Sequence, residues 1–322
     1  MKHILALTAA GCMIAAMAAC SASGSASGKR QTQEVAPEHT AAIAQLQDSL
    51  TAITQRYEGE IGVAVITDCG DTITVGNTDS YPLMSVFKLH QAMALCHRLE
   101  QQGASLDSIV TLRRDELNPD TWSPMMKDHT EGDITLSLGQ LLRYTLMQSD
   151  NNASNYMFDH LQGVAAVDSF IATLIPRESF RLNVTEADMW DNHSLCYDNH
   201  SSPLGVGLLL QRLYTDSILT DGYRQFICTA MAECSTGADR ITAPLTGIDG
   251  VAVGHKTGSG FRDANGILTA HNDAAFITLP GGRHYTLVVL VKDFNGPESE
   301  ASEAISRISA AVYSIVAGQL YS

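Results

Sequence analysis

Residues 81–88, YPLMSVFK, place Ser85 three residues before Lys88 at the start of an apolar segment with helical periodicity. Pro82, just before that segment, is typical of a helix N-terminus, so we expect Ser85 at that end and Lys88 one turn further on the same face. The spacing brings an amine within reach of a hydroxyl that needs a base, and the helix dipole favours the negative charge that develops there. The pair therefore indicates a serine nucleophile, although this spacing alone is a weak pattern.

A second polar block, QSDNNA at residues 148–153, stands between two segments with helical periodicity. Ser149 offers a hydroxyl that can relay a proton, and Asn151 offers an amide that can bind a substrate amide. Alone, this block is equally typical of a polar helix cap.

A third block, GHKTGSG at residues 254–260, lies in a predicted strand, and the glycines of the block allow a ligand to approach the backbone closely. Lys256 supplies a positive charge, Thr257 a hydroxyl, and the backbone N–H of Ser259 can point at an oxyanion. Alone, the block could be an edge-strand lysine and a turn. The occurrence of all three blocks in this order, each in the expected structural context, is hard to explain by chance.

Strand-like segments lie near both ends of the chain, and the residues between them are mainly helical in pattern. We therefore predict an α+β fold, an antiparallel five-stranded sheet flanked by terminal helices with an inserted all-helical domain. Residues 39–83 and 236–322 form the predicted α/β lobe, and residues 84–235 form the helical lobe. Ligand sites favour such junctions, so we expect the site between the two lobes.

The first 20 residues are predicted to be an export signal, and residues 21–38 a flexible tether. The end of the signal has two interpretations. MAAC at residues 17–20 resembles a bacterial lipoprotein box, which would lipidate Cys20 and anchor the exported protein in the periplasm. Ordinary cleavage after Ala18 also fits the small residues there.

Composition excludes some functions. The chain has 322 residues and a net charge of −15, which argues against nucleic acid and requires a locally positive pocket for any anionic substrate. Seven cysteines are present, and those outside the predicted signal are an odd number with no metal-binding spacing. One or two disulfides are possible for an exported protein, but the sequence does not assign them. These cysteines are Cys69, Cys96, Cys196, Cys228 and Cys234.

The three blocks together resemble those of the class A serine β-lactamases and the related penicillin-binding proteins, over about residues 39–316. Residues 233–241 and 291–294 resemble segments of the cephalosporinase-leaning, extended-spectrum subgroup of class A. The resemblance implies a monomeric hydrolase that opens β-lactams, confers β-lactam resistance, and needs no metal or cofactor. It does not rank penicillins, cephalosporins and carbapenems.

The resemblance also implies roles for individual residues. Ser85 is the nucleophile, the N–H groups of Ser85 and Ser259 form the oxyanion hole, and Ser149 passes a proton to the lactam nitrogen. The acylation base is either Lys88 or a glutamate acting through water. Lys256 binds the substrate carboxylate, and the other implied substrate contacts are Asn151, Thr257, Ser259, Trp122 and Arg240.

Deacylation in class A enzymes needs a glutamate on a loop between the second and third blocks. Glu186, in TEADM at residues 185–189, matches the subgroup's pattern and would activate the hydrolytic water. Glu178 and Asp188 are the rival carboxylates on this segment.

Three positions depart from the common class A pattern. Val184 and Asn199 stand where many members have an Arg–Asp pair that pins the loop, and Trp190 stands where many have a water-binding Asn. We therefore expect a different loop anchor and a different water site.

Two alternatives remain at the level of sequence. A penicillin-binding carboxypeptidase would acylate but deacylate poorly, and a β-lactam sensor domain would bind without turnover. The presence of Glu186 argues against both, because neither needs a deacylating carboxylate.

Overall fold

The computed structural model describes residues 37–320, which belong to one compact unit. The predicted export signal, most of the predicted tether and Cys20 lie outside the described residues. None of the helices in the described part of the chain is long and apolar enough to cross a membrane.

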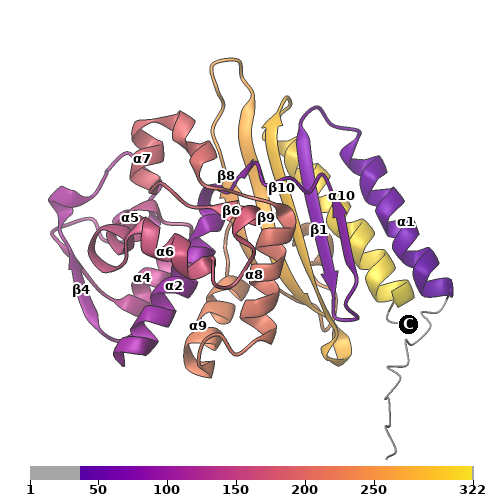
Figure 1. Cartoon of the computed structure of the whole chain (residues 1–322). Coiled ribbons are helices and arrows are strands. Elements are labelled where there is room, and N and C mark those ends of the chain that lie inside the picture. Colours follow the sequence, from indigo (N-terminus) through magenta and orange to yellow (C-terminus); the bar gives the residue numbers. More distant parts are fainter. Residues whose placement is uncertain (1–36, 321–322) are drawn as a thin grey trace, which may run out of the picture. The chain divides into compact units, whose positions relative to one another are not determined.

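A five-stranded antiparallel sheet is the largest sheet of the described residues, and its strand order is β2-β1-β10-β9-β8 (Figure 1). Both ends of the chain contribute to this sheet, as predicted. The strands are β1 (Glu60–Thr67), β2 (Thr72–Val75), β8 (Ala252–Ser259), β9 (Leu268–Thr278) and β10 (His284–Phe294).

Two hydrophobic cores lie on the two faces of this sheet, because successive side chains of a strand point to opposite faces. Val63 and Val289 belong to the core shared with the terminal helices, whereas Ala64 and Val288 belong to the core of the inserted region. The terminal helices are α1 (Pro37–Thr54) and α10 (Glu298–Ile315), which pack side by side, and a π-helical turn (Val316–Leu320) follows α10.

The inserted region is mainly helical rather than all-helical, because two small sheets interrupt it. One has the strand order β3-β7-β6 and the other pairs β4 with β5. Their strands are β3 (Tyr81–Pro82), β4 (Ile109–Leu112), β5 (Ile134–Ser137), β6 (Phe180–Arg181) and β7 (His200–Ser201). The helices of the region are α2 (Phe87–Gln102), α3 (Pro124–Asp128), α4 (Leu138–Met147), α5 (Asn151–Tyr156), α6 (Val164–Ile171), α7 (Glu186–Asp191), α8 (Pro203–Thr215) and α9 (Asp221–Ala232).

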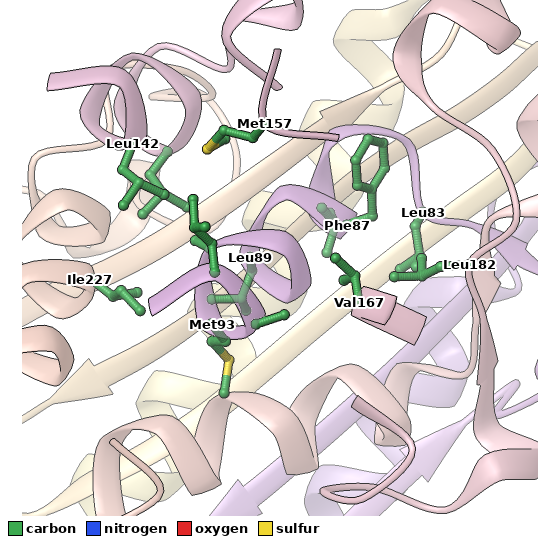
Figure 2. Close-up of a cluster of buried hydrophobic side chains, with 14 of the residues drawn as sticks. Leu83, Phe87, Leu89, Met93, Leu142, Met157, Val167, Leu182 and Ile227 are labelled. Atoms are coloured by element: carbon green, nitrogen blue, oxygen red, sulfur yellow. The ribbon is translucent and has the colours of Figure 1, made fainter. Parts of the chain in front are cut away.

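Helix α2 runs through the middle of the inserted region and is buried over most of its length. Figure 2 shows Phe87, Leu89 and Met93 of this helix among side chains from neighbouring elements. Its buried residues include the polar Lys88, His90 and Gln91 as well as apolar side chains, so neighbouring elements cover it on most sides and fix its position. The labelled neighbours in Figure 2 are Leu83, Leu142, Met157, Val167, Leu182 and Ile227.

A 3-10 turn, Met84–Val86, leads into α2 and carries Ser85, while Lys88 lies in the first turn of the helix itself. Strand β8 passes close to this turn at Gly258. A Cβ on Gly258 would lie 2.5 Å from the backbone oxygen of Leu83, so only glycine fits. The third sequence block can therefore approach the first one because of this glycine.

Candidate active site

Ser85 lies between the two groups that could take its proton. Its Oγ donates to Oε1 of Glu186 at 2.9 Å and accepts from Nζ of Lys88 at 3.0 Å. Lys88 Nζ and Glu186 Oε1 are themselves 2.9 Å apart, and their side chains are 0% and 7% exposed. A hydroxyl, an ammonium and a carboxylate held this closely can exchange a proton without rearrangement.

Lys88 also ties the first sequence block to the second. Its Nζ donates to the backbone oxygen of Ser149 at 2.7 Å and to Oδ1 of Asn151 at 2.6 Å. Ser149 has a positive φ of 61°, which is unusual for a residue other than glycine. Such a conformation persists only where the surroundings enforce it, and here it turns the carbonyl of Ser149 to the ammonium.

The side chain of Asp150 anchors the loop between α4 and α5. This buried carboxylate accepts hydrogen bonds from the hydroxyl of Ser123 and from the backbone N–H groups of Met125 and Ala153. Burial raises the pKa of Asp150, while these donors oppose the rise. The prediction of a loop between two helices is confirmed, and its polar side chains have defined partners.

Lys256 is the second buried ammonium of the site. Its Nζ donates to Oγ of Ser149 at 2.9 Å and to the backbone oxygen of Thr257 at 2.9 Å. Burial is the main reason that its pKa falls to about 7; the nearby Cys234 opposes the fall and Lys88 adds to it. Lys256 therefore places a titrating positive charge directly behind the hydroxyl of Ser149.

Arg240 is buried, and its guanidinium contacts the sheet rather than a surface carboxylate. It donates to the backbone oxygens of Gly258 at 3.2 Å and Asn272 at 2.7 Å, and to Oγ of Ser259 at 2.7 Å. The desolvation caused by burial lowers its pKa. The observed contacts fix the end of β8 and orient the Ser259 hydroxyl, while direct binding of a substrate carboxylate by Arg240 stays a prediction.

A cavity of about 490 Å³ brings most of the predicted site residues together. It is lined by Ser85, Ser149, Asn151, Glu186, Thr257 and Ser259, and by Trp122 and Arg240. Lys88 and Lys256 lie behind this surface and reach it through their hydrogen bonds to Ser85 and Ser149.

Aromatic side chains surround the mouth of the cavity. Trp122 is 53% exposed, and its Nε1 donates to the backbone oxygen of Gln148 at 2.8 Å. Trp190, in α7, also lines the cavity and is 45% exposed. His193 lies in the 3-10 turn that follows α7, and Phe261 lies just after β8. Their rings stack with centroids 3.9 Å apart, so these two segments are in contact.

Three further residues line the cavity without having been predicted from the sequence: His193, Phe261 and Thr236. Thr236 is bonded to Thr257 through their hydroxyls at 2.6 Å. Thr236 stands in the segment that carries the subgroup resemblance, so a signal existed there. No spacing signal could have indicated the contact between His193 and Phe261.

The segment around Glu186 shows why this carboxylate, rather than its rivals, faces Ser85. Thr185 caps α7, and its side chain accepts from the backbone N–H of Asp188, while the Asp188 side chain bonds back to the N–H of Thr185. Asp188 is therefore used as a helix cap. Glu178 lies exposed on a separate turn, Arg177–Ser179.

Asn199 supplies the loop anchor that the sequence left open. Its Oδ1 accepts from the backbone N–H groups of Asn183 at 2.8 Å and Val184 at 3.1 Å. Its Nδ2 donates to the backbone oxygen of Val184 at 2.8 Å, and the side chain is fully buried. One neutral amide thus satisfies three backbone groups just before Glu186.

The five cysteines of the described residues are all free, so none of the disulfides left open by the sequence forms among them. Cys96 and Cys196 are buried, and Cys69 is exposed. Packing rather than cross-linking therefore stabilises residues 37–320.

Comparisons with known proteins agree on one family. A sequence profile of the β-lactamase enzyme family matches residues 45–316. A β-lactamase of Phocaeicola vulgatus is 52% identical over 271 residues, which cover 84% of this chain and 84% of that protein. The extended-spectrum β-lactamase PER-1 of Pseudomonas aeruginosa is 30% identical over 261 residues, which cover 81% of this chain and 83% of PER-1.

The fold agrees as well. A solved structure described as a representative class A β-lactamase from Bacteroides cellulosilyticus superposes on this chain with a TM-score of 0.80 at 30% identity. The match covers 85% of this chain and 98% of the other. It includes the five-stranded antiparallel sheet and the many helices described above.

The role of Asn199 can be tested by removing its amide. Asn199→Ala leaves up to three backbone groups without partners, so we expect the free energy of unfolding to fall by about 2–4 kcal/mol. Asn183→Ala is the matched control, because the exposed Asn183 side chain makes only one 3.3 Å hydrogen bond to a backbone oxygen. Urea denaturation measures both; equal stability of the two variants would contradict the anchoring role.

Proposed function

The chain belongs to the β-lactamase enzyme family as a class A enzyme that hydrolyses the β-lactam amide bond, and we propose that it does so through an acyl-enzyme on Ser85. The observation that carries this proposal is the contact of Ser85 Oγ with both Lys88 and Glu186. Membership of this family favours a β-lactamase over the two alternative functions that the sequence left open, a carboxypeptidase and a sensor domain.

In the proposed acylation, Ser85 Oγ attacks the lactam carbonyl and loses its proton. Lys88 Nζ, at 3.0 Å, can take this proton once it has passed one of its own to Glu186, which lies 2.9 Å away. Alternatively Glu186, whose Oε1 contacts Ser85 Oγ at 2.9 Å in this structure, takes the proton through a water that enters between them. The oxyanion is held by the backbone N–H groups of Ser85 and Ser259. The C–N bond then breaks, and the lactam nitrogen takes a proton from Ser149.

Ser149 is suited to this proton transfer because Lys256 donates to its Oγ at 2.9 Å. A cation beside the hydroxyl stabilises the oxygen after the proton has left. The same ammonium, together with the hydroxyls of Thr257 and Ser259, binds the substrate carboxylate. The chain has a net charge of −15, so this local positive charge is needed to bind an anionic substrate.

In the proposed deacylation, Glu186 takes a proton from a water whose oxygen attacks the ester carbon. The C–O bond to Ser85 then breaks, and Ser85 Oγ, which lies 2.9 Å from Glu186, takes that proton back. Asn151 binds the amide side chain of the substrate, and Trp122 flanks it at the mouth. Both residues line the same cavity as Ser85. The ammonium of Lys88 contacts both Glu186 and the backbone oxygen of Ser149. These contacts keep the Glu186 carboxylate aligned with Ser85.

Glu186→Ala separates the two half-reactions. We expect Ser85 to be acylated but the ester to persist, so that kcat falls by about 100-fold or more. Intact-protein mass spectrometry after mixing with a penicillin measures the trapped acyl-enzyme.

The control variant is Glu178→Ala, which removes the exposed rival carboxylate and should turn over like the parent. If Glu186→Ala shows no trapped species and normal turnover, its role in deacylation is disproved.

We further propose a preference for cephalosporins, and that the enzyme confers β-lactam resistance. Residues 233–241 and 291–294 resemble segments of the extended-spectrum subgroup, and PER-1, a relative at 30% identity, is named an extended-spectrum β-lactamase. The exposed Trp122 and Trp190 at the cavity mouth support this proposal, because large aromatic faces suit bulky substrate side chains.

Steady-state hydrolysis of one penicillin, one oxyimino-cephalosporin and one carbapenem tests the preference. We expect kcat/KM for the cephalosporin to exceed that for the penicillin by about tenfold, a ratio within the range that pocket contacts can supply. Equal values, or a higher value for the penicillin, would contradict the preference while leaving the β-lactamase activity intact.

Finally, we propose that the protein is exported as a monomer and anchored to the periplasmic side of a membrane by a lipid on Cys20. The support is the sequence MAAC at residues 17–20 and the Ser/Gly/Ala-rich stretch after it. Growth with radioactive palmitate should label the parent but not Cys20→Ser. An unlabelled parent protein would favour ordinary cleavage after Ala18.

A further inference from the structure

A thiol, an imidazole and a carboxylate are grouped directly behind Lys256. His255, on β8, bonds through Nδ1 to Oδ1 of Asp273 on β9 at 3.0 Å, and their side chains are 4% and 0% exposed. The other carboxylate oxygen of Asp273 accepts from the backbone N–H of Ile241 at 3.1 Å. Asp273 therefore fixes the ring of His255 and leaves Nε2 as the nitrogen available to Cys234.

Cys234 follows α9, and its thiol is hydrogen-bonded to the side chain of His255, so each group affects the ionisation of the other. Burial opposes ionisation of the thiol, but contact with His255, the charge of Lys256 and contact with Thr236 outweigh it and lower its pKa to about 7. Burial also disfavours the charged imidazole, but Asp273 and Cys234 raise the pKa of His255 to about 10. Near neutral pH the two groups thus approach a thiolate–imidazolium pair.

At the other cysteines of the described residues, neighbouring groups do not outweigh the effect of burial on the thiol pKa. Burial raises the pKa of Cys96 to about 12, and burial raises the pKa values of Cys196 and Cys228 to about 11. Cys69 is exposed, but its pKa is also raised, chiefly by the burial that remains, against the opposing charge of Arg283. The Sγ of Cys69 accepts a hydrogen bond from Arg283 at 3.0 Å, yet among the cysteines of the described residues only Cys234 has a lowered pKa.

Cys234 is also connected to the substrate side of the cavity. Its Sγ lies 3.4 Å from Oγ1 of Thr236, and that hydroxyl lies 2.6 Å from Oγ1 of Thr257, the residue after Lys256. The neighbouring Ser235 is bound to the backbone oxygen of Met147 through its own N–H at 2.9 Å. Because the backbone here is pinned, a group added to Sγ must displace Thr236 or His255 rather than move the loop.

We propose that Cys234 is a modification site for small alkylating electrophiles, with His255 and Asp273 maintaining its thiolate, and that its modification disables the binding of the substrate carboxylate at Lys256 and Thr257. The second half of this proposal rests on the proposed function of Lys256. No three His, Cys, Asp or Glu side chains of the described residues are arranged to hold a metal ion, so the array is assigned to thiol chemistry.

The modification step needs only the electrophile as co-reactant. With iodoacetamide, the thiolate of Cys234 attacks the CH₂ carbon, an S–C bond forms, the C–I bond breaks, and iodide leaves with its electron pair. The thiol proton has already passed to solvent when the thiolate forms. His255 remains protonated and ends beside a neutral thioether.

The experiment follows alkylation of the full chain by iodoacetamide at pH 7, with peptide mass spectrometry for each cysteine and cephalosporin hydrolysis measured in parallel. About half of Cys234 is thiolate at this pH, whereas Cys69 is almost entirely thiol. A lower thiol pKa also lowers the intrinsic nucleophilicity of the thiolate, so we expect Cys234 to react about fivefold faster than Cys69. Hydrolysis should fall by about tenfold or more, in step with labelling of Cys234.

Three variants distinguish inactivation through Cys234 from nonspecific damage by iodoacetamide. Cys234→Ser should hydrolyse the cephalosporin within about threefold of the parent and resist inactivation. Cys69→Ser should be inactivated at the parent's rate. His255→Asn keeps an amide near Asp273 but removes the ring nitrogen that faces the thiol, and should slow alkylation of Cys234 by about tenfold.

Two results would overturn the proposal: faster alkylation of Cys69 than of Cys234, or full labelling of Cys234 with activity retained. Thermal denaturation of the alkylated protein adds a third test, since loss of activity by unfolding would also contradict a local effect. If the parent hydrolyses no β-lactam, the proposed function fails, but the labelling rates still report on the thiol.

Discussion

A buried ammonium must be surrounded by acceptors, and this requirement at Lys88 organises the site. Its Nζ contacts Ser85 in the turn before α2, Ser149 just before α5, Asn151 at the start of α5, and Glu186 at the start of α7. A charge that is 0% exposed would be strongly destabilising if any of these segments moved away. Three segments far apart in the sequence are thus held together by one cation, and the reactive hydroxyl lies between that cation and the carboxylate.

The sequence predicted those parts of the site whose chemistry depends on short spacings. Ser85 and Lys88 are one helical turn apart, and Ser149 with Asn151 and Lys256 with Thr257 stand in compact blocks, so each pair was visible without tertiary information. The five-stranded sheet was predictable for a similar reason, since its strands are apolar runs between turn residues. The two-residue strands β3, β6 and β7 were not, because two residues carry no periodicity.

What the sequence did not reveal depends on contacts between distant segments. Val184 and Asn199 were recognised as departures from the common family pattern, but nothing in the spacing showed that the Asn199 amide binds the backbone of Asn183 and Val184. Arg240 was assigned to a substrate contact, whereas its observed partners are two backbone oxygens and the Ser259 hydroxyl. A long side chain has many possible partners, and only packing selects among them.

The anchor at Asn199 is electrically neutral, and this affects the conditions under which the segment keeps its shape. An ion pair weakens when dissolved salt screens its charges and when acid protonates its carboxylate. An amide bound to backbone groups has no charge to screen and no proton to gain within the ordinary pH range. The geometry around Glu186 therefore does not depend on ionic strength or on pH through this contact, so high salt or mild acid would leave the Asn199 anchor in place.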